Sequence, residues 1–313
     1  MPPCAAYRKG FCDFERMIDL KRFLAIILSL TLLVVLPLGA GAADISSYKS
    51  GEKVVFTDGT WAYEKLSGYG YEIDEYIGTS ASADVPYSFA KQYITAIGDY
   101  AFNGNSTISV VNTTSVLERL GDYAFNNCQS LSKITLYSSL TDLGIGCFYG
   151  DGNLTDINLE DTSINSVPAY CFAESGVTGI KLPETCESIG NYAFYNCSSL
   201  TEIFIPKSVT EINPNAFTGI NGLTIKGNRN SYAQTFANAN GINFETVPLY
   251  GDADENDTVD ILDTTFIQRF RAGLVNFKTE YGRQCADVNK DGKVTLRDAT
   301  MIQMKIAGMD AGF

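Results

Sequence analysis

The feature that most constrains the fold of this chain is an internal repeat in its middle. A single unit of 22 to 24 residues cannot bury its own apolar side chains, whereas stacked units can, so the repeat predicts a solenoid. An alternating apolar run follows most repeat phenylalanines, as in Leu131-x-x-Ile134-x-Leu136. The phenylalanine itself follows an alanine or a cysteine and recurs at Phe102, Phe125, Phe148, Phe172, Phe194 and Phe217.

Each repeat unit predicts a short strand, a turn and a few helix-like residues that carry the phenylalanine. We expect the leucines and isoleucines to form an inner column and the phenylalanines an outer one. Cys128 and Cys197 share one phase of the repeat, while Cys147 and Cys171 replace the alanine before the phenylalanine. Small side chains at such positions suit buried thiols. Disulfides remain the alternative, because the number of cysteines after the N-terminal segment is even, at six, and the chain is expected to be exported.

The N-terminal segment 1–43 has the pattern of a leader with an export signal. Lys21 and Arg22 precede the mostly apolar run 23–36, and small residues at 39–43 offer a cleavage site after Ala42 or Ala43. The run is shorter than the roughly 20 residues of a membrane span, which favours a cleaved signal. A retained membrane anchor is the alternative. We expect translation to start at Met17 and the mature protein to be secreted without a transmembrane anchor.

Composition excludes several function classes. The formal net charge of −13 argues against nucleic acid as a partner, because phosphate binding needs a basic surface. The chain has no histidine, which excludes Ser-His-Asp and Cys-His catalysis and histidine-bound zinc. Hydrolysis by a pair of carboxyl groups stays open.

The acidic tail is also duplicated, since residues 252–263 correspond to residues 287–298. Calcium prefers six to eight oxygen ligands, and a twelve-residue loop supplies them from positions 1, 3, 5, 7, 9 and 12, with a carbonyl at position 7. The first loop has Asp257 where glycine makes the turn, so this residue needs a left-handed backbone and its site is expected to be the weaker one. The predicted ligands of two calcium ions are Asp252, Asp254, Asn256, Thr258, Asp260 and Asp263, and Asp287, Asn289, Asp291, Lys293, Thr295 and Asp298.

The repeat resembles the BspA-type leucine-rich repeat of bacterial surface proteins. The stretches "SVTEINPNAF" and "CESIGNYAFYNCSSLTEIFIPKSV" carry this resemblance, which covers residues 44–247. It implies a leucine-rich-repeat solenoid of mixed β structure with short helical turns. It also implies a role in adhesion or binding and no shared catalytic residues. The ligand, a protein or a glycan, stays open.

The tail resembles a dockerin over residues 250–309, because each loop is followed by one helix and ends in aspartate. The resemblance implies a small all-α domain that calcium folds and that binds a cohesin module of a scaffoldin, within a polysaccharide-degrading cellulosome. Ile261 and Leu296 also have internal packing as an alternative. The residues that the resemblance assigns to cohesin are Ile261, Leu262, Gln268, Arg269, Leu296, Arg297, Gln303 and Met304. The two halves differ, so we expect one binding orientation.

Together these patterns predict a secreted, non-catalytic binding protein that a dockerin attaches to a scaffoldin. The alternative is an enzyme of the same complex, an O-glycosyl hydrolase that takes part in polysaccharide catabolism. Repeat units explain nearly all of the span before the tail, which leaves no length for a separate catalytic domain. No catalytic residues are therefore assigned.

Overall fold

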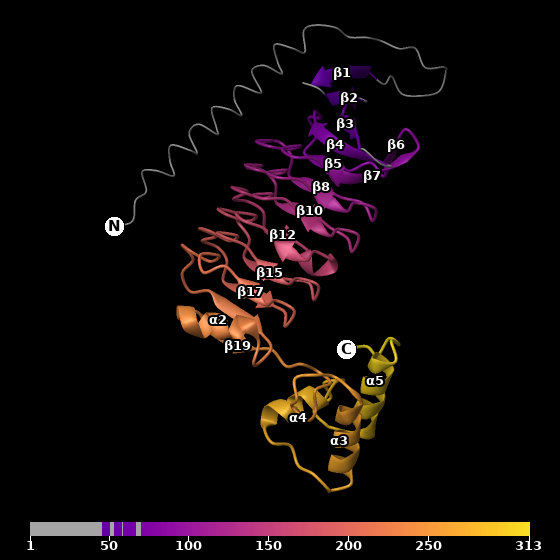
Figure 1. Cartoon of the computed structure of the whole chain (residues 1–313), viewed down its shortest axis with the longest axis vertical. Helices are drawn as coiled ribbons and strands as arrows, with labels where there is room; N and C mark the ends of the chain where they lie inside the picture. The colour runs from indigo at the N-terminus through magenta and orange to yellow at the C-terminus, as the bar shows by residue number, and fades with distance from the viewer. Residues whose placement is uncertain (1–45, 51–52, 58, 67–69) are drawn as a thin grey trace.

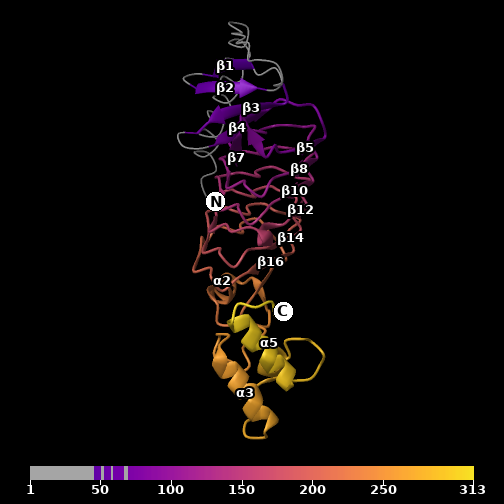
Figure 2. The ribbon, with the colours of Figure 1, turned by 90° about the vertical axis from the view of Figure 1, so that its right-hand side faces the viewer.

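The computed structural model describes residues 46–50, 53–57, 59–66 and 70–313. The predicted leader, including Met17 and the proposed cleavage site, lies outside the described residues. The described chain forms an elongated solenoid with a small helical domain at its end, and both views of the ribbon show this order (Figures 1 and 2). The predicted fold class is therefore confirmed. Among the described residues, no helix has the length and apolar character that crossing a membrane requires.

The solenoid begins with antiparallel strands and then becomes parallel. β1 (Ser46–Ser50), β2 (Lys53–Thr57), β3 (Trp61–Lys65) and β4 (Tyr71–Tyr76) form an antiparallel sheet. β4 pairs in parallel with β7 (Gln92–Ile97), which also pairs with β6 (Ser88–Phe89). The rings of Trp61 and Tyr76 contact Phe102, at centroid distances of 5.9 and 5.2 Å. The N-terminal sheet thus covers the first unit of the repeat.

Two ladders of short parallel strands run along the repeats. Register offsets of one repeat unit, such as Lys133 opposite Asp156, place equivalent residues side by side. The 3₁₀ helix η1 (Leu159–Asp161) lies at the break in the first ladder, inside the longest unit. The first ladder contains β5 (Ser82–Asp84), β8 (Val110–Asn112), β10 (Lys133–Thr135) and β12 (Asp156–Ile157), then β14 (Gly179–Lys181), β16 (Glu202–Ile205), β18 (Thr224–Gly227) and β19 (Asn243–Thr246). The second contains β7, β9 (Arg119–Leu120) and β11 (Asp142–Leu143), then β13 (Ser166–Val167), β15 (Ser188–Ile189) and β17 (Glu211–Ile212).

The repeat phenylalanines form a column inside the core. Their rings stack at centroid distances from 4.6 Å, for Phe102 and Phe125, to 5.5 Å, for Phe194 and Phe217. All six are buried in the same cluster as the leucines and isoleucines of the strands. The phenylalanines therefore form the expected column, and a solenoid coil this small has a single interior that both kinds of side chain fill.

The phenylalanine is held by a turn with two left-handed residues, and not by the helix-like segment that we expected. The first left-handed residue lies two positions before the phenylalanine, where Tyr123, Tyr192 and Gly146 have φ values of 54°, 55° and 59°. In the other phase, two residues after it, Asn127 and Gly150 have φ values of 55° and 73°. Glycine and asparagine adopt this conformation at low cost, which explains their presence there.

The six cysteines that follow the leader are all buried, and none is paired within the described part of the chain. The thiol of Cys197 donates a hydrogen bond to the carbonyl of Phe172 at 2.8 Å, and that of Cys128 donates to Phe102 at 3.1 Å. Burial raises the pKa of Cys186 to about 11 and holds the pKa of Cys171 above its ordinary range. The interpretation of these residues as buried thiols is confirmed.

The helix α2 (Tyr232–Asn240) closes the solenoid at its C-terminal end. Ser231 caps its first turn by accepting a hydrogen bond from the N–H of Gln234 at 3.2 Å. Phe236 then packs edge-on against Phe217, with ring centroids 6.0 Å apart. The last repeat therefore buries its apolar side against a helix with a polar outer surface, as a solenoid end requires.

The helical domain consists of α3 (Ile261–Arg271), α4 (Glu280–Ala286) and α5 (Leu296–Ile306). Helices α3 and α5 pack against each other. The core is small, and it consists of Ala253, Ile267, Ala286, Val288, Val294, Ala299 and Ile302. Helix α4, which precedes the second acidic loop, was not predicted from the sequence.

Candidate calcium-binding and docking site

The two acidic loops have the same hydrogen-bonded backbone. Asp252 begins the first loop and accepts hydrogen bonds from the backbone N–H groups of its fifth and sixth residues, at 2.9 and 3.1 Å. Asp287 begins the second loop and accepts the equivalent bonds at 3.1 and 2.7 Å. The duplication in the sequence therefore corresponds to a duplicated structure.

The last residue of each loop both closes the loop and lies in the first turn of the following helix. Asp263 accepts hydrogen bonds from the N–H of Asp254 at 3.1 Å and of Asp260 at 2.8 Å. Asp298 accepts the equivalent bonds, from Asn289 at 3.4 Å and Thr295 at 2.8 Å. Asp260 and Thr295 are the N-caps of α3 and α5, in capping boxes with these same aspartates. Each helix thus fixes the last predicted ligand of its loop.

The remaining predicted ligands line the loops in the same order. Asn256 accepts a hydrogen bond from the N–H of Thr258 at 2.8 Å, and Asp291 accepts one from that of Lys293 at 2.9 Å. Asp257 has a φ of 66°, which confirms the left-handed backbone expected there, and Gly292 at the equivalent position has 81°. The aspartate therefore occupies the turn without changing its conformation.

The carboxyl groups of the first loop gather closely enough for one cation. Asp252, Asp254 and Asp263 each offer an oxygen, and these oxygens lie within 4.8 Å of one another. Asp252 and Asp263 are fully buried, and burial raises the pKa of Asp263 to about 6. Since burying several carboxylates together without a counter-charge is costly, the donor set fits a calcium ion, which prefers oxygen ligands. Asp298 of the second loop is also fully buried.

The predicted docking residues lie at the surface. Ile261, Leu262 and Leu296 are 54%, 55% and 57% exposed, so internal packing of Ile261 and Leu296 is wrong. Each pair occupies positions 10 and 11 of its loop and begins the following helix. Among the remaining residues assigned to cohesin, Gln268, Arg269, Arg297 and Gln303 are exposed and Met304 is half-buried.

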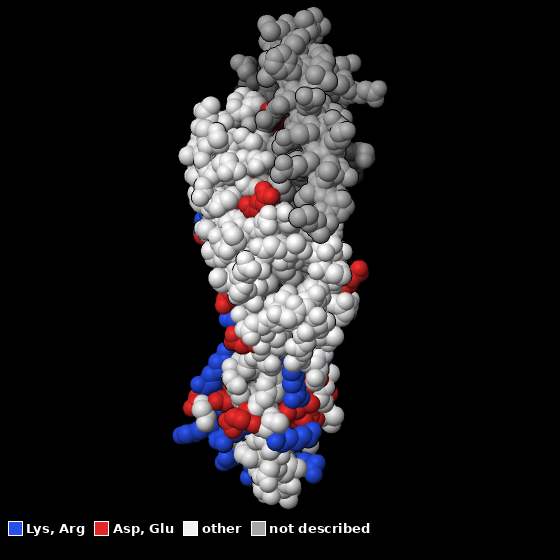
Figure 3. Space-filling model, turned by 90° about the vertical axis from the view of Figure 1, so that its left-hand side faces the viewer, with Lys and Arg blue, Asp and Glu red and all other residues white. Residues whose placement is uncertain are grey.

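A contact between the solenoid and the first loop was not predicted. Arg229, which follows β18, forms ion pairs with Glu255 at 2.7 Å and with Asp257 at 3.1 Å. Figure 3 shows that, on the face in view, charged side chains gather toward the C-terminal end, while the upper part of the solenoid carries few. The sequence alone does not show that Arg229 pairs with Glu255 and Asp257, because these acids lie 26 and 28 positions away from it.

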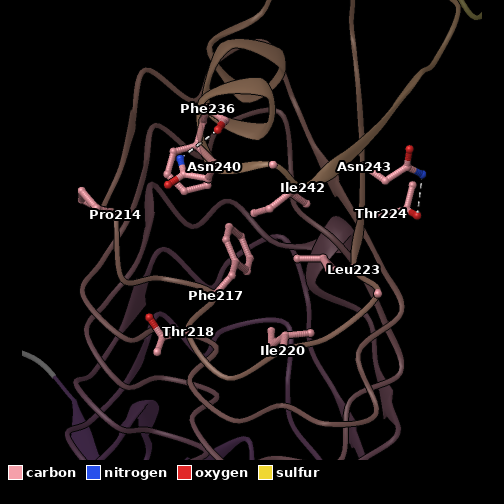
Figure 4. Close-up of a pocket in the computed structure, with 12 residues that line it drawn as sticks. Pro214, Phe217, Thr218, Ile220, Leu223, Thr224, Phe236, Asn240, Ile242 and Asn243 are labelled. Carbon is pink, nitrogen blue, oxygen red and sulfur yellow. Dashed lines mark hydrogen bonds between the residues drawn. The ribbon is translucent and has the colours of Figure 1, made fainter. Parts of the chain in front are cut away.

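A pocket lies between the last repeat and α2 (Figure 4). Its volume is about 550 Å³, and Phe217, Leu223 and Phe236 contribute apolar surface. Its polar groups are the hydroxyl and amide groups of residues such as Thr218 and Asn240, and none of its lining residues is charged. Glycoside hydrolysis ordinarily requires two carboxyl groups at the bond that is cleaved, so this pocket gives no support to an enzyme.

Comparison with protein families identifies two regions. Residues 95–224 match the BspA type leucine rich repeat region, in six copies, and residues 250–307 match the dockerin type I domain. Both resemblances that the sequence suggested are thereby confirmed. A dockerin type I domain is a calcium-binding module with a cohesin partner, and neither matched region is a catalytic domain.

Several solved structures are similar to the repeat region. A leucine rich cell surface protein from Faecalibacterium prausnitzii has 23% identity and a TM-score of 0.48, covering 57% of this chain and 56% of its own. The leucine rich repeat protein of T. pallidum has 17% identity and a TM-score of 0.47, covering 59% of this chain and 95% of its own. A protein from Eubacterium ventriosum has 27% identity and a TM-score of 0.38, covering 55% and 42%. Among curated proteins, the comparison finds no match.

Proposed function

Because the chain combines a BspA-type leucine-rich repeat region with a type I dockerin domain, we propose that it is a secreted binding protein held on a scaffoldin. The dockerin, residues 250–309, binds a cohesin module when two calcium ions occupy its loops. The repeat domain, residues 44–247, binds a protein or glycan, and segment 1–43 directs export. The complex degrades polysaccharides, and the protein contributes attachment and not catalysis.

One observation carries this proposal. Two loops with the same backbone each contain a fully buried aspartate at position 12 among their predicted oxygen ligands, and each ends in the first turn of a helix that begins with an exposed apolar residue, Ile261 or Leu296. Calcium would be held by the predicted ligands Asp252, Asp254, Asn256, Thr258, Asp260 and Asp263, and by Asp287, Asn289, Asp291, Lys293, Thr295 and Asp298. The ion would supply the positive charge that lets these groups lie together, so metal binding and docking are linked.

The test measures binding of the full chain to a panel of recombinant cohesin modules by surface plasmon resonance, with calcium and with EDTA. We expect at least one module to bind with calcium and none to bind after chelation. The double variant Asp263→Ala, Asp298→Ala should lose binding, whereas Asp310→Ala, an exposed aspartate beyond α5, should retain it. Binding that persists in EDTA would contradict the proposal, as would failure of the whole panel.

The same chain also tests the absence of catalysis. Incubation with a panel of plant polysaccharides should release no reducing sugar. The ligand of the repeat domain can be identified by capture from cell-surface and plant-fibre extracts, with the dockerin saturated by a cohesin. Measurable turnover of any polysaccharide would replace the binding function by an enzymatic one.

A further inference from the structure

Arg229 forms a dense contact between the solenoid and the first acidic loop. Its guanidinium pairs with the carboxylates of Glu255 and Asp257, and Nη2 donates to the backbone carbonyl of Glu255 at 2.5 Å. The side chain of Arg229 is 22% exposed and that of Glu255 only 5%. Such a shielded, forked arrangement of charge-assisted hydrogen bonds is stronger and more directional than an ordinary surface ion pair.

Neighbouring groups reinforce this contact. From the solenoid, Asn230 donates to the carboxylate of Asp257 at 3.0 Å, and Lys207 donates to its backbone carbonyl at 2.5 Å. The guanidinium of Arg229 also lies over the ring of Tyr281 in α4, 4.7 Å from its centroid. The solenoid thus contacts both the first loop and α4.

The acidic residues in this contact are not predicted calcium ligands. Glu255 and Asp257 occupy positions 4 and 6 of the first loop, between the ligand positions. In the second loop the same positions hold Lys290 and Gly292, with equivalent left-handed φ values of 58° and 81°. The second loop therefore has the same backbone but lacks both carboxylates. The substitution of aspartate for glycine at position 6 provides the acceptor that Arg229 binds.

The contact makes the two halves of the dockerin unequal in space. Ile261 and Leu262 are positions 10 and 11 of the first loop, and they therefore lie at the end of the domain held by the solenoid. Phe313, beyond the C-terminal end of α5, lies beside Gly251 at the start of the first loop. The C terminus accordingly lies on the side that faces the solenoid, in both ribbon views (Figures 1 and 2).

Leu296 and Arg297 lie at the opposite end of α5. This helix has 11 residues, which separates its ends by about 16 Å at 1.5 Å per residue. A typical protein interface buries about 800 Å² on each partner, an area much larger than two side chains, so a partner needs clearance around the residues that it contacts. The solenoid contacts the first loop through Arg229, Asn230 and Lys207, so a partner at Ile261 and Leu262 would have to fit beside this contact, whereas a partner at Leu296 and Arg297 would not.

We propose that Arg229 and Asp257 form an interdomain clamp, which fixes the dockerin against the solenoid and selects its second half, at Leu296 and Arg297, as the face that binds the partner. The identity of the partner as a cohesin rests on the proposed function, but the clamp itself does not. The clamp gives a structural reason for a single binding orientation, beyond the difference between the two residue pairs.

The clamp is tested by the distance between spin labels placed at Gly152 in the solenoid and Thr300 in α5, both exposed, in calcium-saturated full chain. We expect one narrow distance distribution in the parent chain. Arg229→Ala and Asp257→Gly should each broaden this distribution. The second variant introduces the glycine that the second loop has at the same position, Gly292, so the first loop should still fold. Arg283→Ala removes an exposed arginine of α4 and should leave the distribution narrow. An unchanged distribution in both clamp variants would overturn the proposal.

The choice of face is tested by cohesin affinity. The pair Leu296→Ala, Arg297→Ala should weaken binding by about tenfold or more, and Ile261→Ala, Leu262→Ala by less than about threefold. In the Asp257→Gly background this difference should shrink. Equal losses for the two pairs in the parent chain would refute the selection of the second half. If no cohesin binds at all, the proposed function fails, while the label distances still decide whether the clamp exists.

Discussion

The solenoid and the dockerin bury apolar surface in different ways. The solenoid has one continuous core from Trp61 to Ala237, in which every coil adds a phenylalanine to the same column. The dockerin core is seven residues, and fully buried beside it are three aspartates, Asp252, Asp263 and Asp298. If calcium binds as proposed, a domain too small to be stabilised by its apolar core depends on a bound ion, whereas a repeat protein relies on repetition.

The largest expected difference between the two regions is their response to chelation. EDTA should abolish the folding transition of the dockerin, because the buried carboxylates then repel one another without a cation. The transition of the solenoid should not move. Thermal unfolding followed by circular dichroism measures both, since the helical signal comes mostly from α3, α4 and α5. A helical signal that survives chelation would contradict this dependence.

Within the solenoid, the centre of the phenylalanine column should be the most sensitive point. Phe148→Ala leaves a cavity between two stacked rings, at centroid distances of 5.4 and 5.2 Å. We expect the free energy of unfolding to fall by about 3–5 kcal/mol, measured by urea denaturation. Tyr137→Ala, at a side chain that is 41% exposed, should change it by no more than about 0.5 kcal/mol. Comparable losses in the free energy of unfolding for both variants would contradict the importance of the shared phenylalanine column.

A smaller effect is expected at Asp151, a buried acid inside the solenoid. One carboxylate oxygen accepts a hydrogen bond from the N–H of Cys128 at 2.8 Å, and the other has no partner among the described residues. Burial raises the pKa of Asp151 well above its ordinary value. The stability linked to this proton is therefore complete below the pKa of the unfolded carboxyl and is lost as the pH rises through the raised pKa.

Asp151→Asn should consequently stabilise the solenoid at neutral pH, by about 1–2 kcal/mol, because folding then no longer requires a buried carboxyl to take up a proton. Denaturation over a series of pH values measures this gain, which should vanish in acid. Glu160→Gln, at an exposed acid of η1, serves as the control and should not alter the pH dependence. A gain that is the same at every pH would argue against a raised pKa of Asp151 in the folded state.

The smallest expected effect is a difference in cysteine reactivity between the solenoid and the dockerin. Cys171 of the solenoid and Cys285 of the dockerin are both fully buried. Alkylation followed by peptide mass spectrometry should detect neither residue as modified when calcium is bound. After chelation, Cys285 should become reactive and Cys171 should remain protected. Modification of both residues on the same timescale would mean that the two regions do not unfold independently.

The repeated features of the fold were predictable from the sequence, and the unrepeated ones were not. The phase of the cysteines and phenylalanines revealed buried positions because six units present the same pattern. The two acidic loops were recognisable for the same reason. Helix α4 has seven residues and no counterpart before the first loop, so no pattern announced it. The 3₁₀ helix η1 likewise occurs in one unit, the longest.

The interdomain contact of Arg229 depends on tertiary structure alone. An arginine in a closing unit and two acids in a loop are each ordinary surface residues, and only the folded end of the solenoid brings them together. Asp257 was visible as a departure from the glycine of the second loop, and its left-handed backbone was foreseen. Its partner was not, because a departure from a pattern does not indicate what the new side chain contacts.

The parallel strands of the solenoid have a mechanical consequence. Since the chain enters at one end and leaves at the other, a pull along the long axis acts on the coils in series, and the outermost coil must detach first. Each detached coil of 22 to 24 residues releases about 75 Å of slack at 3.3 Å per residue. A tether built this way lengthens in steps under load, and force spectroscopy would record each step as one extension of that size.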